Sequence, residues 1–390
     1  MADGPRPLRA DEFEQLYDLL AAAFHSSRSR EHSGSWVVNE GNRANLRVVA
    51  EDGKVVTHAG MAYHPASLAG CQVKVTCVGG VATFAEYRGR GFASLAFQDC
   101  CDKAAADGAD VMLISGGRGL YTRVGCRRVG TDLDFTITPE NVERVRATAE
   151  PVEVAPVDVD RAAELSALYR LEPVRFLRPL EEWELALQSK SAMARGTDFW
   201  GVFRGGALLA YVFVNPPSAL RRDAGREARA RVVEHAGDRA VIVAALPWLL
   251  DHYAAQRLTI YVQPSDPLLR QRLSGLGIAG TLTDTWGTVR VINFCQLMER
   301  CRPLLAERLG LKLARELRFA MDERPGSALG GFAIHHGAES VQIADLATLA
   351  QYLFGVPGGE PTVPAGSPAL AAALGAALPL PTLWYGISYA

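Results

Sequence analysis

The sequence has 390 residues, of which 48% are hydrophobic and 22% charged, and its formal net charge is −2. This length exceeds one ordinary hydrophobic core and this composition excludes a disordered chain, so we expect two or three globular domains. The low charge disfavours a nucleic-acid partner, and glycine and proline break the most apolar late stretch, 369–384, so we expect no membrane span and a cytoplasmic protein.

The first predicted elements are a hairpin, a strand, a helix and a strand. Residues 46–65 alternate apolar and polar side chains around Asp52-Gly53, which is typical of a β-hairpin. A strand over 73–85, a helix over 92–106 and a buried strand over 109–115 are predicted to follow. This order predicts a mixed α/β domain.

The same order recurs after roughly 150 residues, which indicates a duplicated unit. Between the two copies lies a proline-, valine- and acid-rich segment, 148–160, which we interpret as a connection. The second copy has a predicted hairpin over 199–214, a strand over 230–237, a helix over 238–255 and a strand over 257–264.

The C-terminal part of the sequence differs from both copies. Segments 316–323 and 330–337 are predicted strands, and 345–355 and 367–381 are predicted helices, the first of them capped by Asp345. This pattern predicts a small α+β module. The last residues are rich in aromatic side chains, whereas a free tail is usually polar, so we expect the end of the chain to be packed inward.

The stretch "EYRGRGFAS", 86–94, places two glycines and two arginines between a predicted strand and a predicted helix. The backbone N–H groups of a first helical turn have no intrahelical partner and carry partial positive charge, so this turn can bind an anion. The alternative is an ordinary strand-to-helix turn with solvated arginines. In the second copy, "HAGDRA" stands at this place, so the anion site is missing there.

The run from Arg88 to Ala93 fits R-x-x-G-x-A and resembles the pyrophosphate loop of the GNAT superfamily of N-acetyltransferases. The resemblance implies acetyl-CoA as cosubstrate, without a metal. Gly79-Gly80 would mark a bulge that opens the sheet for the pantetheine arm, or else a simple edge irregularity. The residues implied to bind acetyl-CoA are Val81, Ala82, Thr83, Arg88, Gly89, Arg90, Gly91, Phe92, Ala93, Ser94, Gly116 and Gly117.

A second motif, "GGRGLYTRVG", contains Tyr121 directly after a buried strand. A tyrosine hydroxyl can protonate a departing thiolate, because its pKa lies slightly above that of a thiol. Taken alone, Tyr121 also fits a core aromatic. The resemblance to GNAT enzymes favours the acid role.

The whole chain resembles the Eis (enhanced intracellular survival) family of N-acetyltransferases, through "VATFAEYRGRGFAS", "GGRGLYTRVG" and the ending "LPLPTLWYGISYA". The resemblance implies tandem GNAT folds followed by a small α+β sterol-carrier-like domain, with boundaries at 1–150, 151–295 and 296–390. It also implies a homo-oligomer, a homohexamer.

The family resemblance implies that the α-carboxylate of Ala390 is the general base, if residue 390 is the natural end. Family members commonly end in an aromatic residue, whereas this sequence ends in Tyr389-Ala390. Glu86 is the competing base, although a solvated turn residue is its simpler interpretation. Residues expected to line the acceptor pocket, or to have plain surface or core roles, are Phe24, His25 and Trp36.

Cysteine and histidine spacing predicts neither a disulfide framework nor a metal site. The seven cysteines form no CxxC pair and are expected to be buried thiols in a reducing compartment. His335 and His336 are adjacent on a predicted strand and therefore point to opposite faces.

The sequence thus predicts an N-acetyltransferase that transfers acetyl from acetyl-CoA to a primary amine of a small, polyamine-like acceptor. Aminoglycosides are acceptors that the family resemblance suggests. The alternative is a non-catalytic acyl-CoA or lipid-binding sensor or carrier. Release of coenzyme A on adding amines would separate the two.

Overall fold

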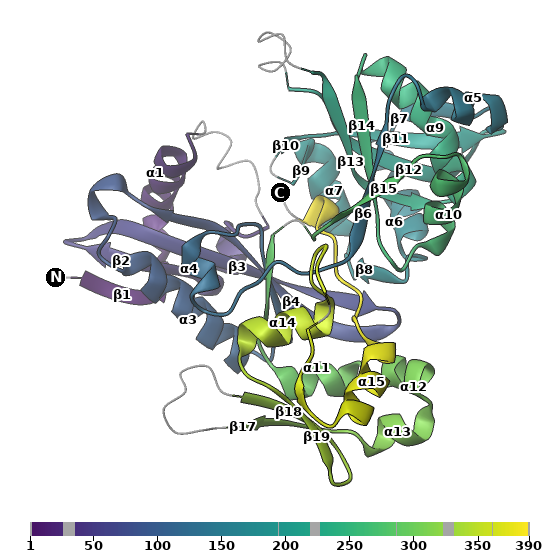
Figure 1. Ribbon diagram of the computed structural model, residues 1–390. Coiled ribbons are helices and arrows are strands. Elements are labelled where there is room, and N and C mark those ends of the chain that lie inside the picture. The colour runs from purple at the N-terminus through teal and green to yellow at the C-terminus, as the bar shows by residue number, and fades with distance from the viewer. Residues whose placement is uncertain are drawn as a thin grey trace. The chain divides into compact units, whose positions relative to one another are not determined.

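The computed structural model describes residues 2–25, 36–193, 195–218, 227–285, 287–322, 331–360 and 362–388 (Figure 1). The chain forms two compact units. Unit 1 comprises residues 1–129 and 286–380, and unit 2 comprises residues 130–285 and 381–390. No helix in the described ranges has both the length and the apolar character needed to cross a membrane.

Unit 1 begins with a twisted sheet in the order β1-β2-β3-β4-β5-β16. Strand β4 pairs in parallel with β5, and the turn between β2 and β3 has positive φ at Asp52 and Gly53, as the hairpin prediction requires. The strands are β1 (Ala2–Pro7), β2 (Leu46–Glu51), β3 (Lys54–Leu68), β4 (Cys71–Thr83), β5 (Val111–Ile114) and β16 (Thr288–Val291).

Helices α1 (Phe13–Phe24) and α3 (Phe92–Ala106) cover opposite faces of this sheet. Met61 packs in one core cluster with Phe97 of α3, whereas its neighbour Ala62 packs in another with Leu16 of α1. Successive residues of a strand point to opposite faces of the sheet, so α1 and α3 lie on opposite faces. The predicted helix over 92–106 is confirmed.

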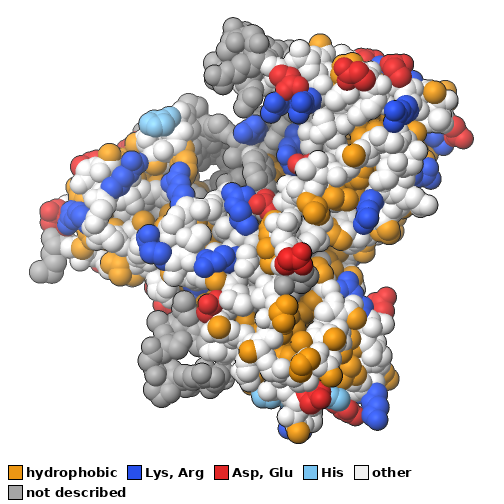
Figure 2. Space-filling view, in the orientation of Figure 1, with side chains coloured by type: hydrophobic (Ala, Val, Ile, Leu, Met, Phe, Trp, Pro, Cys, Tyr) orange, Lys and Arg blue, Asp and Glu red, His pale blue; other side chains and the backbone are white. Residues whose placement is uncertain are grey.

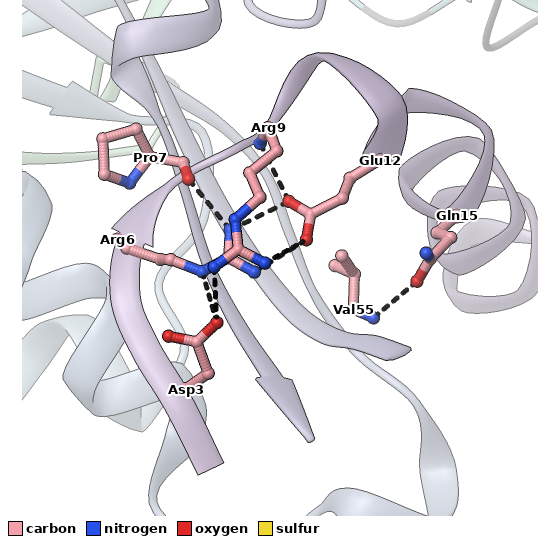
Figure 3. Close-up of polar contacts among 7 residues, drawn as sticks. All are labelled: Asp3, Arg6, Pro7, Arg9, Glu12, Gln15 and Val55. Atoms are coloured by element: carbon pink, nitrogen blue, oxygen red, sulfur yellow. Dashed lines mark hydrogen bonds and ion pairs between the residues drawn. The ribbon is translucent and has the colours of Figure 1, made fainter. Parts of the chain in front are cut away.

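Polar contacts fix the start of α1 against the sheet (Figure 3). Glu12 accepts hydrogen bonds from both terminal nitrogens of Arg6, at 2.8 and 2.7 Å, and from the backbone N–H of Arg9 at 2.8 Å. Burial opposes ionisation of Glu12, but these donors outweigh it and lower the pKa of the carboxyl. Gln15 accepts from the backbone N–H of Val55 at 2.8 Å, which joins α1 to β3.

The later part of unit 1 is the predicted α+β module. Its antiparallel sheet has the order β17-β18-β19-β20, and Asp345 caps α14 by accepting from the backbone N–H of Thr348 at 2.7 Å. The elements are α11 (Phe294–Arg300), α12 (Arg302–Leu309), α13 (Leu311–Glu316), β17 (Arg318–Asp322), β18 (Gly331–His336), β19 (Glu339–Ile343), α14 (Leu346–Phe354), β20 (Ala365–Gly366) and α15 (Pro368–Ala377).

Unit 2 repeats the strand–helix order of unit 1. Its sheet has the order β15-β6-β14-β13-β12-β11-β7 and packs around α5 (Val142–Thr148) and α9 (Arg239–His252). The strands are β6 (Asp132–Ile137), β7 (Glu153–Pro156), β11 (Asp198–Arg204), β12 (Ala207–Asn215), β13 (Arg229–Gly237), β14 (Arg257–Val262) and β15 (Gly280–Thr283). The other helices are α6 (Ala162–Tyr169), α7 (Leu180–Ser189) and α10 (Pro267–Gly275).

The compact units do not follow the boundaries expected at 150 and 295. Strand β6 pairs with β14 of unit 2, and β16 pairs with β5 of unit 1. Strands β5 and β14 each have an edge to which an antiparallel strand can add. The local sequence of β6 or β16 does not determine which of these two edges it pairs with. Segment 148–160, interpreted as a connection, contains β7, which pairs with β11 at the edge of the sheet.

All seven cysteines, and His335 and His336, lie within the described residues. No disulfide joins any of the seven cysteines, and all of them except Cys295 are buried. His336 contacts Glu316 at 2.8 Å, and the described part of the chain contains no cluster of residues suited to a metal ion.

Candidate active site

The sheet of unit 1 opens between β4 and β5. The parallel ladder runs from Val75 opposite Val111 to Val78 opposite Ile114, and β4 then continues alone on that side to Thr83. Against β3, the pairing shifts by one residue between Gly79 and Ala82, with Gly80 at φ 63°. The predicted bulge is therefore present, and Val81–Thr83 present backbone groups toward the opening.

His58 was not among the residues selected from the sequence, yet this side chain supports the bulge. It is fully buried, and its Nδ1 lies 2.7 Å from the carbonyl oxygen of Gly80. Burial lowers the pKa of His58 to about 4, so the neutral ring donates its Nδ1 proton to that carbonyl. A Cβ on Gly80 would lie 3.0 Å from the ring, which explains a glycine at this position.

The turn after β4 leaves the N-terminus of α3 open. Gly89 and Gly91 have φ values of 79° and 82°, in the left-handed region that favours glycine. A Cβ at either residue would meet no atom within 4 Å, and no side chain of the described residues caps α3. The uncapped N–H groups of Phe92, Ala93 and Ser94 therefore face accessible space, which fits a pyrophosphate group.

Side chains in this turn also have structural contacts. Arg88 donates to the carbonyl of Thr83 at 3.2 Å, and Arg90 forms a two-point ion pair with Glu51, with one contact of 2.7 Å. The hydrogen bond from Arg90 lowers the pKa of Glu51. Phe92 is buried against the core beside β2 and β3. A ligand at this turn would therefore contact the backbone of Phe92 and not its side chain. The pairing with Glu51 partly neutralises the positive charge that Arg90 could offer to the ligand.

Tyr121 lies on α4 (Gly119–Thr122), next to the opening of the sheet. It is buried with its ring edge-on to Phe97, 5.1 Å between centroids, in a core cluster against which Val81 packs. A Cβ on Gly116 would lie 3.1 Å from the ring of Tyr121. Thr288 of β16 donates to the carbonyl of Gly116 at 2.8 Å and so holds this loop. Tyr121 is thus a core residue that also lies near β4, the strand that borders the opening.

Basic side chains gather over the surface around α4 (Figure 2). The exposed arginines of this stretch are Arg118, Arg123 and Arg128. A Cβ on Gly117 would lie in van der Waals contact with the guanidinium of Arg128. The positive charge of these arginines suits a phosphate-bearing ligand. The sequence motif contained Arg118 and Arg123 but not Arg128.

The other predicted site residues are only partly described. Phe24 is the last residue of α1 and is half exposed, and His25 follows it with φ 53°. Trp36 packs edge-on to His64, 6.4 Å between centroids, and no described contact joins it to Phe24. Exposed Glu86 pairs with Lys54 at 3.6 Å. The carboxylate of Ala390 lies outside the described residues.

Residues 5–129 match a family model described as an acetyltransferase (GNAT) domain. No curated protein matches the sequence. Among solved structures, a probable N-acyltransferase from Enterococcus faecalis V583 is similar over 98% of both chains, with a TM-score of 0.67 and 13% identity.

Two further structures have the same fold. A GCN5-related N-acetyltransferase from Anabaena variabilis covers 90% of this chain and 89% of its own, with a TM-score of 0.60 and 13% identity. Eis1 from Mycobacterium abscessus gives the same coverage, with a TM-score of 0.56 and 15% identity. The expected mixed α/β fold class is confirmed, and the matched domain is that of acyl-CoA-dependent N-acetyltransferases.

Proposed function

We propose that unit 1 transfers an acetyl group from acetyl-CoA to a primary amine of a small acceptor. The observation that carries the proposal is the open edge of β4, which leads directly into the uncapped N-terminus of α3. A flexible arm can hydrogen-bond along the edge while its phosphates bind the helix end. Val81 of β4 packs against the core cluster that contains Tyr121.

Each residue of the site has a distinct role in this proposal. The backbone of Val81, Ala82 and Thr83 holds the pantetheine arm, and the N–H groups from Gly89 to Ser94 hold the pyrophosphate. When bound, acetyl-CoA supplies an activated acyl thioester. Gly116 and Gly117 let its sulfur end come close, and Tyr121 holds the proton that the departing thiolate needs.

The acceptor amine must lose a proton, and we propose the α-carboxylate of Ala390 as its base. The resemblance to Eis enzymes supports this choice, and the pairing of Glu86 with Lys54 disfavours the competing residue. Phe24, His25 and Trp36 remain the proposed acceptor-side residues. Aminoglycosides are proposed acceptors on the same resemblance.

The finer assignments rest on the same resemblance. We propose that the α+β module of unit 1, within the predicted range 296–390, is a sterol-carrier-like domain, that the part of unit 2 within the predicted range 151–295 belongs to a GNAT domain without a pyrophosphate loop, and that the protein is a homohexamer. We also propose a reducing, cytoplasmic location, which fits seven cysteines that form no disulfide.

A thiol-release assay over a panel of primary amines tests the function. Amine-dependent release of coenzyme A is expected; tight binding of acetyl-CoA without release for any amine would favour the sensor or carrier. Gly91→Glu should abolish coenzyme binding, because it adds bulk and negative charge where pyrophosphate sits. Gly53→Glu is the matched control, since Gly53 has φ 79° and no atom within 4 Å of a Cβ. Equal calorimetric affinity of both variants would contradict the loop assignment.

A further inference from the structure

The sheet of unit 2 opens at the same place as the sheet of unit 1. Strand β13 pairs with β14 in parallel from Arg229 opposite Arg257 to Val232 opposite Ile260. It then continues to Gly237, and its pairing with β12 shifts by one residue at Val233. Both sheets therefore separate after four parallel pairs and carry a bulge just beyond. In unit 1 this opening is the proposed coenzyme cleft.

In unit 2, segment 381–388 of the chain itself fills the opening. Trp384 donates from Nε1 to the carbonyl of Val233, the bulge residue, at 2.6 Å. Its ring stacks on Tyr261 of β14, 3.6 Å between centroids and 17° between planes. Gln263, just after β14, donates to the carbonyl of Thr382 at 2.6 Å. The segment thus bridges the two separated strands and satisfies a carbonyl that the ladder leaves unpaired.

A buried ion pair anchors the end of this segment. The side chains of Arg178 and Glu234 are 1% and 5% exposed and form two hydrogen bonds, of 2.7 and 2.8 Å. Glu234 also accepts from the backbone N–H of Ile387 at 2.9 Å, and Arg178 donates to the hydroxyl of Ser388 at 2.8 Å. A buried ion pair is stable only when its remaining hydrogen-bonding groups have partners, and the segment supplies two of them.

Gly386 makes this approach possible. Its φ is 51°, and a Cβ there would overlap the Oε2 atom of Glu234. Residues 383–388 are all buried. The glycine therefore serves both the left-handed turn and the close passage of backbone over the carboxylate.

The helix that follows β13 is unsuited to a pyrophosphate. Asp238 caps α9 by accepting from the N–H groups of Ala240 and Val241, at 2.7 and 3.1 Å. Arg239, the adjacent cation, is already paired with Glu172 and Asp266. A small cavity of about 40 Å³ beside Trp384 is lined by these carboxylates, by Glu234 and by Arg239 itself. Negative charge and occupied N–H groups both oppose an anion here.

We propose that the cleft of unit 2 is a binding site for the chain's own segment 381–388, anchored by Arg178 and Glu234, and that it takes this peptide in place of a coenzyme. Only the comparison with the coenzyme cleft of unit 1 rests on the proposed function. Because the peptide occupies the cleft of unit 2, each chain should have one coenzyme site.

Hydrogen exchange followed by mass spectrometry tests the docking in the full chain. In the unsubstituted protein, amides of 383–388 should exchange at least about 100-fold more slowly than an exposed segment. Gly386→Glu should remove this protection while leaving that of α9, because it places a second carboxylate against Glu234. Gly275→Glu in α10 is the control, since a Cβ at Gly275 meets no atom within 4 Å.

A peptide with the sequence of residues 381–390, labelled at its N-terminus, gives a second readout. It should bind the Gly386→Glu protein, whose cleft is vacated, and not the unsubstituted protein. Calorimetry of the unsubstituted protein should give one coenzyme A per chain. Unprotected amides in the unsubstituted protein, protection unchanged by Gly386→Glu, or two coenzymes per chain would each overturn the inference. None of these readouts requires turnover, so a protein without transferase activity would refute the proposed function alone.

Discussion

Asp132, the first residue of β6, offers a quantitative test of the structure of unit 2. Its side chain is fully buried; Oδ1 accepts from the hydroxyl of Thr382 at 3.5 Å, and Oδ2 has no partner among the described residues. Burial raises the pKa of Asp132 to about 7, and the nearby carboxylates Asp134 and Asp284 add to this effect. Asp134 is itself paired with Arg231 at 3.0 Å.

The raised pKa makes the stability of unit 2 depend on pH in a defined direction. The unfolded carboxyl titrates near pH 3.8, so between about pH 4 and pH 7 the folded state holds a proton that the unfolded state has lost. Stability therefore falls as pH rises through this window. A difference of about 3 pH units at about 1.4 kcal/mol each corresponds to about 4 kcal/mol above pH 7.

Asp132→Asn removes the ionisation and should remove this pH dependence. Relative to the unsubstituted protein, the variant should gain roughly 2 to 3 kcal/mol more stability at pH 8 than at pH 5, where roughly 1 to 2 kcal/mol of the effect is already present. Urea unfolding followed by tryptophan fluorescence reports on unit 2, which holds Trp183, Trp200, Trp248 and Trp384. Asp160→Asn, at an exposed site of the same unit, is the control. A gain of equal size at both pH values would refute the reasoning.

Three further predictions concern the active site and assembly. Tyr121→Phe should keep coenzyme affinity and lower kcat by roughly 10²- to 10⁴-fold, measured by thiol release; an unchanged kcat would leave Tyr121 a core residue only. If the carboxylate of Ala390 is the base, amidating it should abolish turnover at saturating acetyl-CoA, and equal rates for acid and amide would direct attention to Glu86. Light scattering should give the mass of a hexamer, and a mass near one 42.0 kDa chain would contradict it.

Local sequence determined the elements around the proposed coenzyme cleft. The helix over 92–106 and the hairpin at Asp52-Gly53 form as predicted, because apolar periodicity and glycine positions act over a few residues. The bulge near Gly80 and the cap at Asp345 were predictable for the same reason. The left-handed turn within the motif from Arg88 to Ala93 depends on its own glycines, and its role in binding pyrophosphate stays a prediction.

Contacts between residues distant in the sequence were decided only by the tertiary structure. Strands β6 and β16 each join an edge that local pattern cannot select. Arg178 and Glu234 form an ion pair although they lie 56 residues apart in the sequence. The hydrogen bond from Arg178 to Ser388 joins residues that are 210 positions apart. Nothing in the immediate neighbours of Gly386 indicates a carboxylate against it. Burial of these groups, and the hydrogen bonds that compensate it, exist only once the whole unit has closed around them.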